Sequence, residues 1–149
     1  MEVLITNRQN FCPISEERIR KTASALLEAL GKTGAELSLL IVDNEQIAEI
    51  NKTYLDRTGP TNVIAFPMGD SGFDEIQPEL LGDIVISVET ADKEASNAGY
   101  CMEERFTELL IHGILHLLGY DHETNEQDAK QMNEKSDELM AYLKARKDQ

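Results

Sequence analysis

The pattern of apolar and polar positions along the chain predicts short strands that alternate with helices. In several segments apolar side chains recur every three or four residues, which is the spacing of a helix with one face on a core. Apolar and β-branched runs bounded by turn residues predict strands. The predicted strands cover residues 3–6, 36–42, 62–66 and 83–89, and the predicted helices cover residues 15–30, 43–54, 90–98, 102–118 and 124–143.

Local signals define some of the element boundaries. Either Asp43 or Asn44 can cap the second helix, and Thr124 opens the last helix with a capping box. Residues 83–89 form a nearly continuous apolar run, which predicts a strand buried on both faces. Residues 67–80 mix prolines, glycines and acidic residues without periodicity, so we expect a mobile loop there.

Length and composition indicate one globular domain over residues 1–149. No apolar stretch approaches the ~20 residues of a membrane span, and the first residues do not resemble a secretory signal. We therefore expect a soluble, cytoplasmic protein with no membrane partner. Cys12 and Cys101 lie far apart and form no CxxC pair, which argues against a disulfide framework or a thiolate metal site.

The formal net charge of −14 restricts how the protein can bind nucleic acid. A chain with this charge repels phosphates at long range, whereas general affinity for nucleic acid usually comes from a basic surface. Any contact with RNA must therefore depend on a local site, on the charge of a metal ion or on a basic partner. The same charge favours a positively charged partner protein.

All three histidines of the chain fall within the segment HGILHLLGYDH, residues 112–122. His112 and His116 are four residues apart on a predicted helix, so both rings can reach one ion. His122 would point away from them if the helix continued. Gly119 can adopt the left-handed conformation that ends a helix, which would bring His122 back toward the other two.

These histidines predict a catalytic metal site. His112 and His116 are the sole polar side chains between Leu109 and Leu118, so we expect a buried helix whose imidazoles need a shared partner. Imidazole ligands suit zinc, and also nickel, copper or iron. We predict one Zn²⁺ ion on His112, His116 and His122. Three protein ligands leave one tetrahedral position open, which is typical of catalytic zinc.

The spacing of the three histidines is also that of the metzincin proteases, whose motif has a glutamate directly after the first histidine. Here this position is Gly113. A peptidase of the standard mechanism would therefore lack the group that activates water. This observation disfavours a protease.

The segment HGILHLLGYDH resembles the signature H-G-x-L-H-L-x-G-Y-D-H of the YbeY family of ribosomal-RNA maturation endoribonucleases. Upstream, PTNVIAFP and LLGDIVIS resemble two further segments of that family, so the likeness covers about residues 40–140. It implies a zincin-like α+β domain with a small four-stranded mixed sheet flanked by helices. It also implies zinc-dependent cleavage of single-stranded RNA in 16S ribosomal RNA 3′-end maturation and ribosome quality control. The implied partners are single-stranded rRNA, the ribosomal subunit and ribosome-associated proteins.

The main departure from the family pattern concerns a phosphate-binding arginine. The family usually has this arginine directly after N-x-x-Y, whereas here Leu55 follows Tyr54. Leucine cannot replace a bidentate, charge-assisted contact. Arg57 is the nearest replacement and our candidate catalytic cation. Arg105 is the alternative, because it shares the helical face of His112.

The remaining motif positions give weaker indications. Asn62 stands where the family has aspartate, and Ala65 stands where it has serine. Asp83 and Asp121 are the motif carboxylates that remain. We include Asp121 among the candidate catalytic residues, because it can orient a ligand histidine by a hydrogen bond. The alternative is that Asp121 shapes the turn.

Three hypotheses therefore remain open. The first is a zinc-dependent endoribonuclease acting in ribosome maturation. The second is a ribosome-assembly factor whose metal site does not cleave RNA, which the missing arginine and the net charge of −14 make credible. The third is a metal-dependent hydrolase or peptidase of small substrates.

Overall fold

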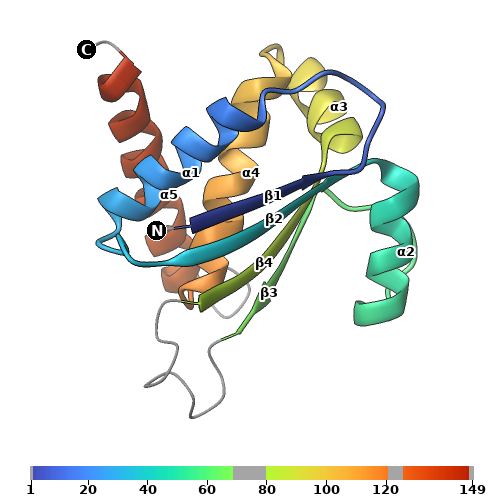
Figure 1. Cartoon of the computed structure of the whole chain (residues 1–149), viewed down its shortest axis with the longest axis horizontal. Helices are drawn as coiled ribbons and strands as arrows, with labels where there is room; N and C mark the ends of the chain where they lie inside the picture. Colours follow the sequence, from blue (N-terminus) through green and yellow to red (C-terminus); the bar gives the residue numbers. More distant parts are fainter. Residues whose placement is uncertain (1, 69–79, 121–125, 148–149) are drawn as a thin grey trace.

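The computed structural model describes residues 2–68, 80–120 and 126–147, and Figure 1 shows the arrangement of their strands and helices. No helix in these three ranges is long and apolar enough to cross a membrane. In chain order the elements are β1 (Glu2–Asn7), α1 (Glu16–Ala29), β2 (Glu36–Val42), α2 (Asn44–Leu55), β3 (Val63–Pro67), β4 (Leu80–Ser87), α3 (Val88–Ala98), α4 (Met102–Leu117) and α5 (Glu126–Lys147).

The strands form one mixed sheet in the order β1-β2-β4-β3. β2 runs parallel to both β1 and β4, whereas β3 pairs with β4 antiparallel. α1 connects β1 to β2, and α2 and β3 lie between β2 and β4 in the chain. The expected α+β fold with a four-stranded mixed sheet flanked by helices is confirmed.

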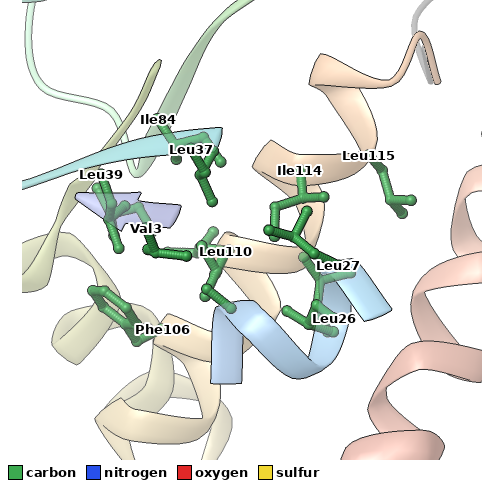
Figure 2. Packing of buried hydrophobic residues seen from close by; sticks show 14 of the residues in the cluster. Val3, Leu26, Leu27, Leu37, Leu39, Ile84, Phe106, Leu110, Ile114 and Leu115 are labelled. Carbon is green, nitrogen blue, oxygen red and sulfur yellow. The ribbon is translucent and has the colours of Figure 1, made fainter. Parts of the chain in front are cut away.

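Helices cover the two faces of the sheet unequally. The main core lies on the face that packs against α1 and α4, and Figure 2 shows Leu37, Ile84, Leu110 and Ile114 within it. On the opposite face α2 contributes a smaller apolar cluster, in which Ile47 packs with residues of β2, β3 and β4. β4 is covered on both sides as its apolar run predicts, and Ile84, Val85, Ile86 and Ser87 are all buried.

Both ends of β4 and the end of β3 are among the boundaries that differ from the sequence predictions. β4 begins at Leu80, earlier than predicted, because its first residues pair with β2 and β3. It ends at Ser87, whose hydroxyl accepts a hydrogen bond from the Thr90 N–H and so caps α3, which begins at Val88. Pro67 is itself the last residue of β3, one residue beyond the predicted end.

Asp43 is the residue that caps α2, with a complete capping box to Gln46. The capping box predicted at Thr124 and most of the loop predicted over residues 67–80 lie outside the described residues.

Candidate metal centre

The helix that carries the histidines, α4, is a central part of the core. Its buried residues include Phe106, Leu110 and Ile114, and it packs against both β3 and β4. Gly113 makes this packing close, because a Cβ atom at this position would lie 2.9 Å from Ile84 Cγ2 and 3.0 Å from Ile84 Cδ1. The sheet therefore fixes the position of α4, and a side chain at position 113 would collide with it.

His112 and His116 lie one turn apart on α4. Their ring centroids are 5.5 Å apart, and their ring planes are inclined by 40°. Both side chains are half-buried, so the imidazoles are less buried than the apolar sequence around them predicts. The flank of α4 that carries them turns partly away from the sheet, because the buried residues occupy the rest of the helix circumference.

The end of α4 reverses the chain immediately after the second histidine. Gly119 has a φ of 99°, and the helix stops at Leu117. The Gly119 N–H donates to the His116 carbonyl, and the Tyr120 N–H donates to the Leu115 carbonyl, each at 3.0 Å. These two bonds define a Schellman motif. The predictions of a positive φ at Gly119 and of a helix that ends before His122 are confirmed.

The described part of the site fits a metal in its donor chemistry. It offers two imidazoles on one face of a fixed helix, both accessible from outside, followed by a turn that leaves the helix axis. Within residues 2–68, 80–120 and 126–147, no three His, Cys, Asp or Glu side chains are grouped to hold an ion. The third predicted ligand, His122, and the candidate Asp121 lie outside the described residues. The zinc site remains a prediction.

A polar network occupies the same face of α4 one to two turns before His112. Arg105 Nε donates to Glu94 Oε1 at 2.9 Å, and Arg105 Nη1 donates to Glu108 Oε1 at 3.0 Å. The Tyr100 hydroxyl donates to the same Glu108 oxygen at 2.7 Å. Asn62 completes the network, with its side-chain amide 3.2 Å from Glu94 Oε1. The network joins the start of β3 to α3 and α4.

This network determines the electrostatic state of Arg105. Burial lowers the pKa of its guanidinium, but hydrogen bonds to Glu108 and Glu94 outweigh burial, and the net pKa is raised. The hydrogen bond to Glu108 likewise raises the pKa of Tyr100. Arg105 is thus a charged group already neutralised by two carboxylates.

The other candidate cation, Arg57, lies after the end of α2. Asp56 ends this helix in the left-handed conformation with a φ of 53°, and the Arg57 N–H donates to the Asn51 carbonyl at 3.2 Å. The Arg57 side chain is exposed. α2 and α4 lie on opposite faces of the sheet (Figure 1), so the approach of Arg57 to the histidines remains a prediction.

Two motif residues on the sheet point in opposite directions. Asp83 is exposed and pairs with Phe66, and strand alternation puts it on the α2 face, opposite the face that Ile84 presents to α4. Ala65 lies on the α4 face, because its neighbour Ile64 belongs to the cluster under α2. Asp83 is therefore on the wrong face to contact the histidines directly.

Sequence comparison agrees with this architecture. Residues 4–144 match the family described as Endoribonuclease YbeY. The chain belongs to this family. An "Endoribonuclease YbeY" from Geobacter sulfurreducens is 45% identical over 144 residues, which cover 96% of each chain. Another from Aquifex aeolicus is 40% identical and covers 87% of this chain and 85% of its own.

The fold also matches a solved structure. The solution structure of a Thermotoga maritima protein superposes with a TM-score of 0.64 at 24% identity, covering 95% of this chain and 88% of that one. This likeness supports the fold alone. The family resemblance and the expectation of a hydrolytic enzyme of the YbeY family are confirmed by the sequence matches.

The structure explains one departure from the family pattern and adds residues that the sequence did not single out. Where the YbeY pattern has aspartate, Asn62 donates an amide hydrogen bond to the Glu94 carboxylate, which an aspartate carboxylate cannot do. Glu108 was not among the candidates, although it precedes His112 by one helical turn. The helical spacing of Glu108 and His112 could have indicated that the two share a face. The hydrogen bond from Tyr100 to Glu108, by contrast, depends on the fold.

Proposed function

We propose that this protein is a zinc-dependent, single-strand-specific endoribonuclease that acts in 16S rRNA 3′-end maturation and ribosome quality control. Membership of the YbeY family supports RNA cleavage. The observation that carries the metal-dependent mechanism is the His112–His116 pair on the last turns of α4, followed by the reversal at Gly119.

In this proposal His112, His116 and His122 hold the ion. Bound zinc would supply Lewis-acid polarisation of the phosphodiester group. The protein's own residues orient and stabilise the substrate. The half-buried histidine face of α4 admits a ligand from outside, and the core behind it keeps that face fixed. Arg57 would stabilise the negative charge that develops on phosphate oxygens in the transition state.

The packing of Gly113 argues against a peptidase. The metzincin base would have to occupy this position, but an added Cβ already approaches Ile84 to 2.9 Å. Ile84 is fully buried in the core and cannot move aside cheaply. The lack of a glutamate at this position therefore follows from how closely α4 packs on β4.

A second candidate is a ribosome-assembly factor whose metal site does not cleave RNA. Arg105 is already bound by Glu94 and Glu108, so it is a poor source of a free phosphate contact. Leu55 occupies the position of the family arginine. Cleavage activity therefore depends on Arg57, and if Arg57 does not take part, binding without cleavage is the expected outcome.

The proposed partners and location follow from the proposed substrate. Single-stranded rRNA is the substrate, and the ribosomal subunit with its associated proteins is the setting. A net charge of −14 favours basic proteins among these partners. Because bacterial ribosomes are assembled in the cytoplasm, we expect the protein there.

A cleavage assay with defined metal content tests the proposal. Zinc-loaded and chelator-treated protein would be incubated with single-stranded RNA, with the same sequence as a duplex, and with a peptide library. We expect cleavage of the single strand by the zinc-loaded protein alone. Zinc binding with RNA binding but no cleavage would favour the assembly factor. Peptide cleavage would favour the small-substrate hydrolase.

A further inference from the structure

An acidic protein that binds RNA needs a source of affinity other than general attraction to phosphates. The chain carries 28 acidic residues against 14 basic ones. Stacking of bases on aromatic side chains contributes to single-strand binding without any such attraction. An exposed aromatic ring in a region poor in acidic residues would therefore indicate where the RNA lies.

Such a region runs from the end of α2 into β3. Residues 51–68 contain a single acidic residue, Asp56, together with Lys52 and Arg57. Both basic side chains are exposed. This stretch is locally positive in a chain of net charge −14, so it repels a phosphate backbone less than the chain as a whole does.

The same stretch carries three of the five large apolar residues that are exposed in the described part of the chain. These three are Tyr54, Leu55 and Met68. Tyr54 is the most exposed of all, at 69%. Its position continues the apolar stripe of α2 beyond Ile47 and Ile50, past the part of the helix that packs on the sheet.

The Tyr54 ring has an aromatic neighbour on the sheet. Phe66 of β3 contacts it edge to face, with centroids 5.8 Å apart and planes inclined by 70°. Because an edge-to-face contact covers at most one face of either ring, at least one broad face of Tyr54 is left uncovered by Phe66. Phe66 itself is half-buried in the cluster under α2, so it forms a fixed support.

This aromatic pair lies at the same end of β3 as the last turn of α4. A Cβ at Gly82 would collide with the Phe66 carbonyl oxygen and would lie 3.1 Å from Leu117 Cδ2. Leu117 directly follows His116. β3 is the last strand in the sheet order, so a strand of RNA passing its outer edge can contact both the α4 side and the α2 side.

We propose that Tyr54, supported by Phe66, stacks against one unpaired base of the RNA substrate, with Lys52 and Arg57 facing its phosphates. This inference rests on the proposed function, because it requires single-stranded RNA as the ligand. It assigns a base-binding role to the α2 face, whereas the proposed metal ligands belong to α4.

The test measures binding of the zinc-loaded protein to a short fluorescent uridine oligonucleotide with 2′-O-methyl riboses. We expect Tyr54→Ala and Tyr54→Leu to weaken binding about 5- to 150-fold, the range for loss of one stacked base. Tyr54→Phe should bind like the wild type. Tyr54→Leu keeps an apolar cover over Phe66 without an aromatic face, so it separates stacking from support of the fold.

Two controls make the result specific. Phe11 is another exposed aromatic residue, in the segment between β1 and α1, and Phe11→Ala should leave binding unchanged. The second control uses a series of oligonucleotides, each of which lacks one base. At one position, loss of the base should weaken binding to the wild type. The same loss should not weaken binding to Tyr54→Ala any further.

The outcomes separate this inference from the proposed function. Stacking would be overturned if Tyr54→Ala or Tyr54→Leu bound RNA like the wild type. It would also be overturned if base removal still weakened binding at every position in Tyr54→Ala. In both cases, RNA cleavage by the wild type would still support the nuclease. A wild-type protein that neither binds nor cleaves RNA would overturn both.

Discussion

The last turns of α4 and α2 lie on opposite faces of the sheet at the same end of β3, but they are held in place very differently. α4 ends in a Schellman motif with a glycine, behind a row of fully buried side chains. α2 ends at a left-handed aspartate, Asp56, and its last residues are exposed. The first arrangement fixes its polar groups through the core, whereas the second relies on the buried Asn51 side chain, which donates to the Gly59 carbonyl, and on the Tyr54–Phe66 contact.

This difference explains why the two halves of the proposed site can be predicted unequally. On α4, helical spacing alone determines that His112 and His116 share a face. Beyond α2, the reach of Arg57 depends on the path of a short exposed segment. A core helix is therefore the safer place for metal ligands, and an exposed helix end is the place where substrate contacts can change between relatives.

The largest expected effect comes from removing a histidine from α4. We expect His116→Ala to abolish zinc binding and RNA cleavage, because two remaining ligands cannot hold the ion tightly. Stability in the absence of metal should change little, since the side chain is half-buried. Metal analysis and a cleavage assay measure the effect, and Thr107→Ala, which changes another half-buried residue of the same helix, is the control. Unchanged zinc content in each of the three histidine variants would refute the site.

The next effect tests how closely α4 is held. Gly113→Glu restores the residue of the metzincin motif, but it forces an uncompensated charge against Ile84. We expect the free energy of unfolding to fall by about 3–5 kcal/mol, as for other unpaired buried charges, and no peptidase activity to appear. Urea denaturation measures the first result. A stable variant with peptidase activity would show that our account of this position is wrong.

Substitutions at the exposed end of α2 and in the segment after it should change activity and leave the fold intact. We expect Arg57→Ala to lower the rate of RNA cleavage about 100-fold, in the range for loss of one group that stabilises transition-state charge. Zinc content should not change. Leu55→Arg, which restores the family residue, should raise cleavage. Lys32→Ala removes an exposed cation between α1 and β2, outside the proposed RNA-binding surface, and serves as the comparison.

Equal cleavage rates in the wild type, Arg57→Ala and Leu55→Arg would contradict this role. They would show that the segment after α2 does not hold the reacting phosphate.

The smallest effect concerns the turn that links the two described histidines to the third. Gly119 and Gly99 both follow helix ends with positive φ, at 99° and 85°, and a Cβ at either would meet no atom within 4 Å. Gly119→Ala and Gly99→Ala should therefore each cost about 1 kcal/mol of stability, from the left-handed backbone alone. We expect Gly119→Ala alone to weaken zinc binding. Equal zinc affinity in both variants would show that the turn does not position a ligand.

Several features of the protein follow from the sequence alone. The strand Glu36–Val42 has the predicted bounds, and the end of α4 has the predicted conformation at Gly119. At Gly119 the decisive bonds join residues close together in the chain, and at Glu36–Val42 the apolar run itself marks both ends of the strand. The family and its fold could likewise be identified from the motif around His112 and His116.

Other features were decided by tertiary contacts. His112 and His116 are less buried than the sequence predicts. The spacing of apolar residues along a helix does not show how much of its surface the sheet covers. β4 begins at Leu80 because neighbouring strands pair with it there. The contacts between Asn62 and Glu94 and between Tyr54 and Phe66 join residues that are distant in the chain. Such contacts form only when the whole sheet and its helices have assembled, so no local pattern in the sequence contains them.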